Sequence, residues 1–175
     1  MKKSLFLLLA GLLTGAAQAS VGGYPVVLVH GFQPDNLQSK PTGEKVSENG
    51  GQYWAQYWRD RADERIDWPS QERIANKITS QYVWPKLQQL SRSGTCDSGC
   101  VFVTHSTGDL VMRYIIDNQA LWLQNAGLKP LNIVATFDFS GAGGGVELAD
   151  LAANVASGSG LLDSTLKLAV SLWLG

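Results

Sequence analysis

The stretch VFVTHSTGDLVMRY, Val101 to Tyr114, changes its periodicity at a single serine. Ahead of Ser106 the apolar residues form a short continuous run, which is typical of a buried strand. After it they recur at helical spacing, so the stretch predicts a strand that turns sharply into a helix. The residues two positions before and after the serine, Thr104 and Gly108, are small enough for strand and helix to approach each other closely.

Strand and helix signals alternate on both sides of this corner. Two further apolar runs predict strands, from Pro25 to His30 within YPVVLVHGF and from Leu131 to Phe139 ahead of the glycines of GAGGG. Apolar residues at roughly helical spacing predict a helix that stops near Gly94, and the helix after Ser106 is expected to end near Gly127. The first of these helices carries Ile74, Ile78, Val83 and Leu87. The sequence therefore predicts an α/β architecture with a mainly parallel sheet flanked by helices.

Two segments follow the first predicted strand. The polar segment from Gln33 to Gly51 shows no periodicity and is predicted to be a loop at the rim of any site. The aromatic residues after it are spaced three and four apart, which favours one buried helical face; a platform for a sugar or an acyl chain is the alternative. These residues are Tyr53, Trp54, Tyr57 and Trp58.

The N-terminus, MKKSLFLLLAGLLTGAAQAS, combines two lysines, an apolar stretch and the small-residue pattern Ala17-Gln18-Ala19. This arrangement is typical of a secretory signal peptide, residues 1–19, and the apolar stretch is shorter than the roughly 20 residues of a membrane span. Residues 20–175 are then expected to form one domain, exported to the periplasm or the medium. At its end, Glu147 to Leu174 is predicted to be helical and to begin a lid over an apolar pocket.

The composition narrows the class of protein. Hydrophobic residues make up 45% of the chain and charged residues 17%, enough for a packed core, and the net charge of -1 offers no basic field for nucleic acid. GAGGG lacks the G-K-S/T continuation of a phosphate loop, and two histidines without clustered partners fall short of a metal site, so neither a cofactor nor a metal is expected.

Cys96 and Cys100, in a loop-like segment of an exported chain, predict a local disulfide worth about 2 kcal/mol.

A serine at a strand-to-helix corner suits one kind of chemistry. Its oxygen stands clear of the sheet there, and the first N–H groups of the helix are unpaired and oriented by the helix dipole. Such N–H groups can stabilise the negative charge that develops on a carbonyl oxygen under attack. Asp109, close to the corner, is expected to favour the helix N-terminus through the same dipole.

Three motifs resemble those of α/β-hydrolases. THSTG at this corner is similar to their nucleophile elbow, G-x-S-x-G, and YPVVLVHGF resembles the strand of bacterial triacylglycerol lipases whose following turn completes the oxyanion hole. The later SGAGGGVELADL is similar to the lipase segment T-P-H-x-G-S-x-x-A-D-L. The resemblance covers Tyr24 to Asp150 and implies an α/β-hydrolase fold that is incomplete toward its C-terminus.

The resemblance also implies roles for individual residues. Ser106 is the nucleophile, and the backbone N–H groups of Phe32 and Thr107 form the oxyanion hole. The other matched residues have structural roles beside the site; they are His30, Gly31, His105 and Gly108.

This sequence departs from the lipase pattern in three places. Thr104 replaces the first glycine of the elbow, which requires the threonine hydroxyl to pack or bond at the turn. FDFS replaces T-P-H, and Asp138 within it is a candidate for the catalytic acid, although an aspartate in this position more often caps a turn. His30 and His105 both precede Ser106, whereas the family order is serine, acid, histidine.

Two explanations for the missing base stay open. The acid and the histidine lie beyond Gly175 in a longer chain, which the apolar helical pattern of the last residues favours, or the chain is a relative that has lost the triad. The predicted function is that of an exported serine hydrolase, which cleaves carboxylic lipid esters through an acyl-serine intermediate. The alternative is a catalytically inactive lipid- or partner-binding module. The expected partner is a small ester or a lipid substrate, and the protein is expected to contact a lipid interface. The oligomeric state stays open.

Overall fold

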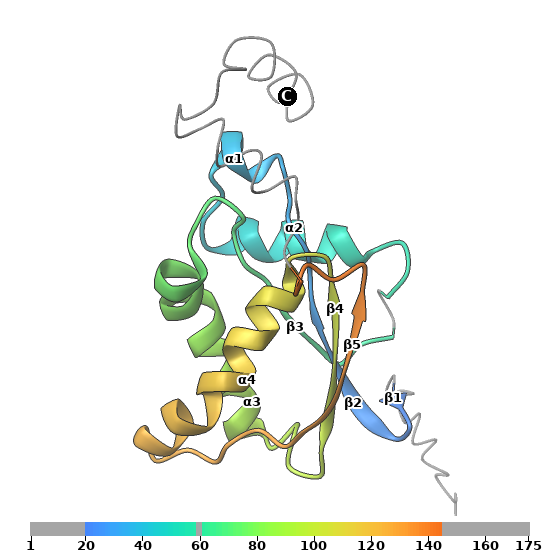
Figure 1. The fold of residues 1–175 in the computed structure, drawn as a ribbon, viewed down its shortest axis with the longest axis vertical. Coiled ribbons are helices and arrows are strands. Elements are labelled where there is room, and N and C mark those ends of the chain that lie inside the picture. Colours follow the sequence, from blue (N-terminus) through green and yellow to red (C-terminus); the bar gives the residue numbers. More distant parts are fainter. Residues whose placement is uncertain (1–19, 59–60, 145–175) are drawn as a thin grey trace, which may run out of the picture.

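The computed structural model describes residues 20–58 and 61–144, and Figure 1 shows their arrangement. The strands are β1 (Ser20–Val21), β2 (Tyr24–Val29), β3 (Glu64–Ile66), β4 (Cys100–His105) and β5 (Ile133–Phe139). The helices are α1 (Asn36–Ser39), α2 (Glu44–Trp54), α3 (Trp84–Ser93) and α4 (Gly108–Asn125), with a wider π-type segment, η1 (Ile74–Val83), directly ahead of α3. The predicted signal peptide, residues 1–19, and the predicted terminal helix, residues 147–174, lie outside the described residues.

A five-stranded, mainly parallel sheet forms the centre, which confirms the predicted α/β architecture. The parallel strands lie side by side in the order β3-β2-β4-β5, and the short β1 pairs antiparallel with β2. The register aligns Val29 of β2 with Thr104 of β4, and Thr104 with Asp138 of β5. The carboxyl ends of β2, β4 and β5 therefore meet at one edge of the sheet (Figure 1).

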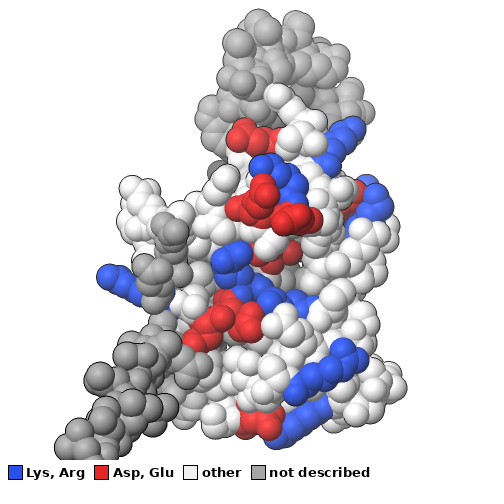
Figure 2. Space-filling model, turned by 180° about the vertical axis from the view of Figure 1, so that it is seen from behind, with Lys and Arg blue, Asp and Glu red and all other residues white. Residues whose placement is uncertain are grey.

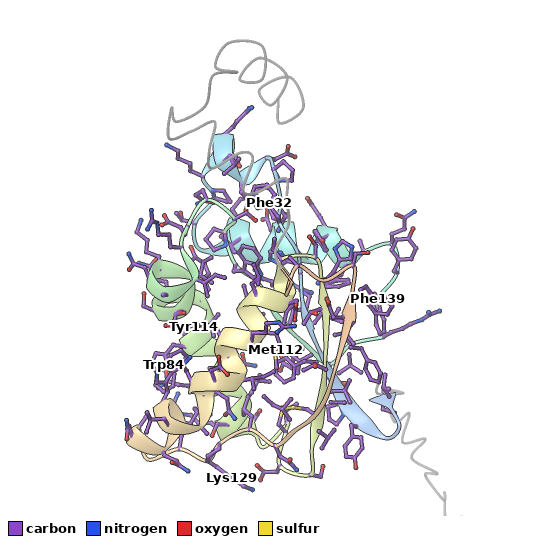
Figure 3. All side chains as sticks on the ribbon, in the orientation of Figure 1. Phe32, Trp84, Met112, Tyr114, Lys129 and Phe139 are labelled. Carbon is purple, nitrogen blue, oxygen red and sulfur yellow. A yellow bond between two sulfur atoms is a disulfide. The ribbon has the colours of Figure 1, made fainter. Side chains whose placement is uncertain are left out.

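Both faces of the central strand β2 are covered, as the alternation of its side chains between two cores shows. Val27 and Val29 belong to a large core with η1, α3 and α4, whereas Val26 and Leu28 belong to a smaller core with Trp54 of α2. Figure 3 shows Met112 on the side of α4 that faces the sheet, where it is part of the larger core. The run in β2 is therefore apolar on both sides because both sides are buried.

The segment from Gln33 to Gly51 is not a loop, so this prediction was wrong. It contains α1 and most of α2, although serine, asparagine and two glycines are weak helix formers. Packing outweighs this propensity, because Val46, Gly50 and Trp54 follow one another at helical spacing and are all buried. A Cβ at Gly50 would collide with the carboxylate of Asp67, so the glycine lets the helix approach the chain that follows β3.

The aromatic residues near the end of α2 do not share one buried face, and this prediction was wrong as well. Trp54 is buried, but Tyr57 is 70% exposed, and Tyr53 and Trp58 are half-buried. The helix ends at Trp54 and turns follow it, so the helical spacing on which the prediction depended is broken.

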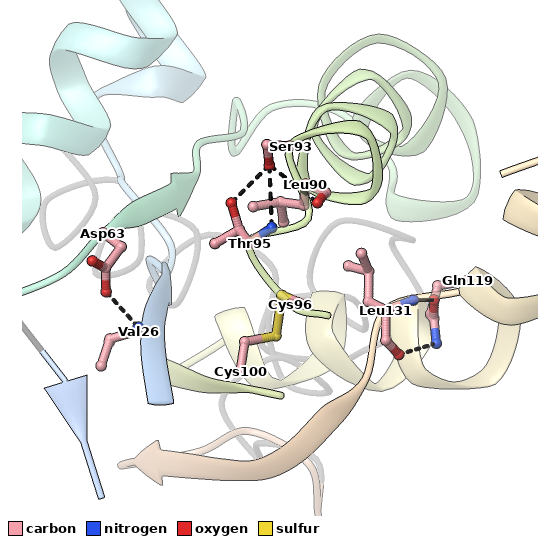
Figure 4. Close-up of a disulfide and its surroundings, with 9 residues drawn as sticks. All are labelled: Val26, Asp63, Leu90, Ser93, Thr95, Cys96, Cys100, Gln119 and Leu131. Atoms are coloured by element: carbon pink, nitrogen blue, oxygen red, sulfur yellow. Dashed lines mark hydrogen bonds between the residues drawn. A yellow bond between two sulfur atoms is a disulfide. The ribbon is translucent and has the colours of Figure 1, made fainter. Parts of the chain in front are cut away.

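Cys96 and Cys100 form the predicted disulfide in the turn between α3 and β4 (Figure 4). Both cysteines are buried against the larger core. In the same figure, the side-chain amide of Gln119 on α4 bonds to the N–H and the carbonyl of Leu131, ahead of β5. These contacts fix the amino ends of β4 and β5, at the edge of the sheet opposite to Ser106.

Several charged side chains on the surface form ion pairs. Lys86 contacts Glu64 at 2.7 Å and Arg65 contacts Asp67 at 3.2 Å, beside β3. Figure 2 shows blue and red side chains interspersed over this side of the molecule. In the described part of the chain, no helix has the length and apolar character needed to cross a membrane.

Candidate active site

The strand order places a topological switch point between β2 and β4, because the chain leaves β2 toward β3 on one side and returns to β4 on the other. In open parallel sheets, ligands bind outside the carboxyl ends of the strands at such a point. Here the chain after β2 continues through His30, Gly31 and Phe32, and β4 ends directly before Ser106. Figure 3 shows Phe32 near this edge of the sheet, as well as Phe139 at the end of β5.

Ser106 turns the chain from β4 into α4 in a left-handed backbone conformation, with a φ of 54°. This conformation costs a residue with a Cβ about 1–2 kcal/mol. Hydrogen bonds hold it from both sides. The Ser106 N–H donates to the Phe139 carbonyl at 2.9 Å, and the Ser106 carbonyl accepts from the N–H groups of Asp109 and Ala142 at 3.2 Å each. Strain that is over-determined in this way is concentrated at functional sites.

Two glycines let the end of β2 touch this corner. A Cβ at Gly108 would lie 2.6 Å from the carbonyl oxygen of His30. A Cβ at Gly31 would lie 2.8 Å from the carbonyl oxygen of His105 and 2.9 Å from the Cβ of Ser106. Side chains do not tolerate contacts this short with backbone atoms, so only glycine fits at either position.

The backbone N–H groups of Phe32 and Thr107 flank the region of close contact. Neither donates a hydrogen bond to a backbone carbonyl of the residues that the structure describes. Thr107 directly precedes α4, where the helix dipole concentrates positive charge. Unpaired N–H donors next to a serine are the groups that can stabilise an oxyanion.

Thr104 and Asp138 bond to each other across β4 and β5. The Thr104 hydroxyl is buried and donates to Asp138 Oδ1 at 2.8 Å. Asp138 also lies so close to Gly141 that a Cβ on this glycine would overlap its carboxylate. The threonine in place of the usual glycine is thus accommodated by a partner on the neighbouring strand. Asp138 as a catalytic acid stays a prediction.

His30 is fully buried and both of its ring nitrogens are engaged. Nδ1–H donates to the Gly31 carbonyl at 2.8 Å, and Nε2 accepts from the Trp68 backbone N–H at 3.1 Å. The Trp68 indole N–H donates to the His30 carbonyl at 3.0 Å, and the two rings stack with centroids 5.1 Å apart. His30 therefore joins the chain after β2 to the chain after β3 and has no free nitrogen for a proton transfer.

The burial of His30 predicts a loss of stability in acid. Desolvation lowers the pKa of His30, although the Gly31 hydrogen bond and Asp67 raise it and Arg65 lowers it further. The unfolded chain, with an ordinary histidine pKa of about 6.5, then binds more protons than the folded chain below that pH. We expect the free energy of unfolding to fall as the pH drops below about 6.5, by up to about 1.4 kcal/mol per pH unit.

Denaturant unfolding at pH 7.5 and 5.5 measures this effect, and His30→Gln is the control. Glutamine keeps an acceptor for the Trp68 N–H but does not titrate. The variant should lose less stability in acid than the wild type. An equal loss in both proteins would show that His30 does not carry the effect.

His105 directs its ring toward the end of α2. Its Nδ1 forms a short hydrogen bond with the Tyr53 hydroxyl, and the two ring centroids lie 5.7 Å apart. Tyr53 also lies next to Gly31, because a Cβ on this glycine would be 2.5 Å from the tyrosine oxygen. Tyr53 is the residue of the site to which the sequence assigned no role. Only its place in an aromatic cluster drew attention to it, and nothing in the local pattern pairs it with His105.

The first turn of α4 packs against the glycine-rich stretch after β5. Asp109 forms an ion pair with Arg113 at 3.0 Å, one turn further along the helix. A Cβ at Gly143 would collide with both side chains. Asp109 therefore lies at the positive end of the helix dipole with its own partner, as expected for a residue that stabilises the helix N-terminus.

In the described residues, no group of three or more histidine, cysteine, aspartate or glutamate side chains could hold a metal ion. Comparisons with family models, with curated proteins and with solved structures find no match to this chain. The function is therefore inferred from the motifs and from the geometry at the switch point.

Proposed function

We propose that the chain carries the nucleophile and the oxyanion hole of an exported serine esterase of the α/β-hydrolase type. The observation that supports this most is the left-handed Ser106, between β4 and the N-terminus of α4, at the switch point of a parallel sheet. The strand order agrees with such a site, as do the N–H groups of Phe32 and Thr107, which donate to no backbone carbonyl within residues 20–58 and 61–144. The disulfide suits an oxidising compartment, in line with the predicted signal peptide.

In the proposed reaction, Ser106 Oγ attacks the carbonyl carbon of a carboxylic ester. The carbonyl oxygen becomes an oxyanion, which the N–H groups of Phe32 and Thr107 bind. The intermediate collapses to an acyl-serine when the alcohol leaves with a proton, and water then releases the acid. The serine proton has to pass to a base in the first step.

Neither histidine of the sequence is placed to be this base. His30 uses both nitrogens for backbone groups, and Nδ1 of His105 is bonded to Tyr53. We therefore expect the 175-residue chain to react slowly at Ser106 and to turn over esters feebly or not at all. Enzymes that lose one member of a serine triad still keep a rate advantage of about 10³ over water, which comes from the oxyanion hole and from binding.

Apolar groups near the site suit an acyl chain. Phe139 at the end of β5 is 49% exposed, and its ring lies 6.2 Å from that of Trp58. The backbone carbonyl of Phe139 also accepts the hydrogen bond from the Ser106 N–H, so Phe139 lies directly beside the nucleophile. A lipid or another hydrophobic ester is therefore the proposed substrate class.

A fluorophosphonate with an alkyl chain tests the proposal, because it reacts with the serine and mimics the tetrahedral intermediate. We expect the folded chain to be labelled on the tryptic peptide that contains Ser106, about 10³-fold faster than the same chain in denaturant. The measurement is intact-protein mass spectrometry over time. Labelling no faster than in the unfolded chain would contradict the esterase proposal.

The engaged histidines favour one alternative, a hydrolase-like module that binds lipids or a partner without chemistry. A fluorescent fatty acid separates the two functions. Binding together with an unreactive Ser106 would support the module, whereas labelling at Ser106 supports the esterase.

A further inference from the structure

The hydroxyl of Tyr53 lies where three segments of the chain meet. Tyr53 belongs to the last turn of α2, and its hydroxyl bonds to Nδ1 of His105 at the end of β4. A Cβ on Gly31 would lie 2.5 Å from the Tyr53 oxygen and 2.9 Å from the Cβ of Ser106. The space next to the Gly31 Cα therefore lies between the Tyr53 hydroxyl and the Ser106 side chain.

Packing fixes the ring of Tyr53 in this place. Its centroid lies 5.4 Å from that of His30 and 5.7 Å from that of His105, and it meets Trp54 edge-on at 5.3 Å. The ring also contacts the smaller core of the sheet. The hydroxyl is therefore the only part of the side chain that a phenylalanine would not reproduce.

The protonation state of Tyr53 suits this hydrogen bond. Burial raises the pKa of Tyr53 above its ordinary value, and the backbone of Gly31 opposes this shift. The tyrosine therefore keeps its proton at neutral pH, and its hydroxyl bonds to Nδ1 of His105 as donor or acceptor according to the tautomer of His105.

We propose that Tyr53 is a positioning residue, whose hydroxyl holds the oxyanion loop, Gly31 and Phe32, at a set distance from the nucleophile corner through His105. This inference rests on the proposed function of Ser106. The two amide donors of the oxyanion hole come from different segments, and their separation depends on contacts between those segments. On its other side the loop is held where the Gln33 N–H donates to Ser70 Oγ at 2.8 Å.

The contacts of Tyr53 do not indicate that it is the catalytic base. The Ser106 hydroxyl forms no hydrogen bond with Tyr53 or His105, and the Tyr53 hydroxyl is already paired with Nδ1 of His105. The Tyr53–His105 hydrogen bond therefore positions the N–H donors of the oxyanion hole and does not remove the serine proton.

The first test compares Tyr53→Phe with the wild type in fluorophosphonate labelling. The variant should react about tenfold to a hundredfold more slowly at saturating probe, because small displacements of catalytic groups cost this much. The probe concentration that gives half of the maximal rate should stay the same, since the acyl site is untouched. Tyr57→Phe is the matched control, because Tyr57 is 70% exposed, and it should react like the wild type.

Two substitutions of His105 separate positioning from chemistry. His105→Asn keeps a hydrogen-bond acceptor near the place of Nδ1, so it should retain most of the labelling rate, whereas His105→Leu should be as slow as Tyr53→Phe. If His105→Asn were as slow as His105→Leu, the imidazole itself would be required. That result would overturn the positioning role.

A second readout does not depend on the reactivity of Ser106. We expect NMR order parameters of the Gly31 and Phe32 amides near 0.85 in the wild type and below about 0.6 in Tyr53→Phe. Unchanged order parameters, or equal labelling rates, would overturn the inference. If the wild type did not label but the order parameters fell, the proposed function would fail while the link through Tyr53 would stand.

Discussion

Replacing Ser106 by glycine is expected to abolish labelling by the fluorophosphonate and at the same time to stabilise the fold. The serine holds a φ of 54°, a conformation that glycine adopts without a Cβ penalty. The strain is worth about 1–2 kcal/mol, and part of it is offset by the larger freedom of glycine in the unfolded chain. We expect the free energy of unfolding to rise by about 1 kcal/mol in urea titrations.

Ser106→Ala is the control that separates strain from chemistry. Alanine lacks the hydroxyl but keeps the Cβ, so this variant should lose labelling like Ser106→Gly. The serine hydroxyl makes no hydrogen bond to the described residues, and the stability should therefore stay within about 0.5 kcal/mol of the wild type. If Ser106→Gly were no more stable than Ser106→Ala, the serine would not be strained. A labelled Ser106→Ala would place the reactive group elsewhere.

Replacing Gly108 by alanine is expected to damage both the fold and the site. The new Cβ would lie 2.5 Å from the Val29 carbonyl oxygen and 2.6 Å from that of His30. These are backbone atoms of the central strand and its end, so α4 and β2 have to move apart. Overpacking of this kind costs about 1–3 kcal/mol, and we expect a value near the upper end. The same movement separates Thr107 from Phe32, and labelling should fall at least about a hundredfold.

Gly144→Ala provides the matched control for this prediction. Gly144 lies in the glycine-rich stretch after β5, and a Cβ there would meet no atom of the described residues within 4 Å. Urea unfolding and the labelling rate should both stay close to the wild-type values. A Gly108→Ala protein that matched Gly144→Ala in both measurements would show that strand and helix do not touch at this corner.

The elements with local signals could be predicted from the sequence. The apolar runs of β2 and β4 are continuous and bounded by glycine or by the corner serine, and the structure has strands there. Gly94 and Gly127 end their helices with positive φ values of 70° and 69°, which glycine adopts readily. Such features depend on neighbours in the sequence, and a single chain is enough to read them.

The elements without local signals could not be predicted. β3 has three residues, two of them charged, and becomes a strand because it pairs with Val27–Val29 of β2. α2 forms from weak helix formers because one of its faces is buried against the sheet. In both cases a partner distant in the sequence supplies the stabilisation, so propensity alone indicates a loop.

The candidate site divides in the same way. Ser106, Gly31 and Gly108 were singled out by motifs, and the topology brings them together at the ends of β2 and β4. The hydrogen-bond partners of His105 and Thr104, which flank the serine, could not be predicted from motifs. Tyr53 is 52 residues from His105, and Asp138 is 34 residues from Thr104.

Periodicity and spacing within a few residues are enough to predict the strand-to-helix corner at Ser106, the buried central strands and the pairing of Cys96 with Cys100. Three other features depend on contacts between distant segments: α2 reaches the corner, Tyr53 bonds to His105, and both nitrogens of His30 are engaged. These contacts follow from the order of the strands in the sheet, which brings distant segments to one edge. No local pattern in the sequence predicts this strand order.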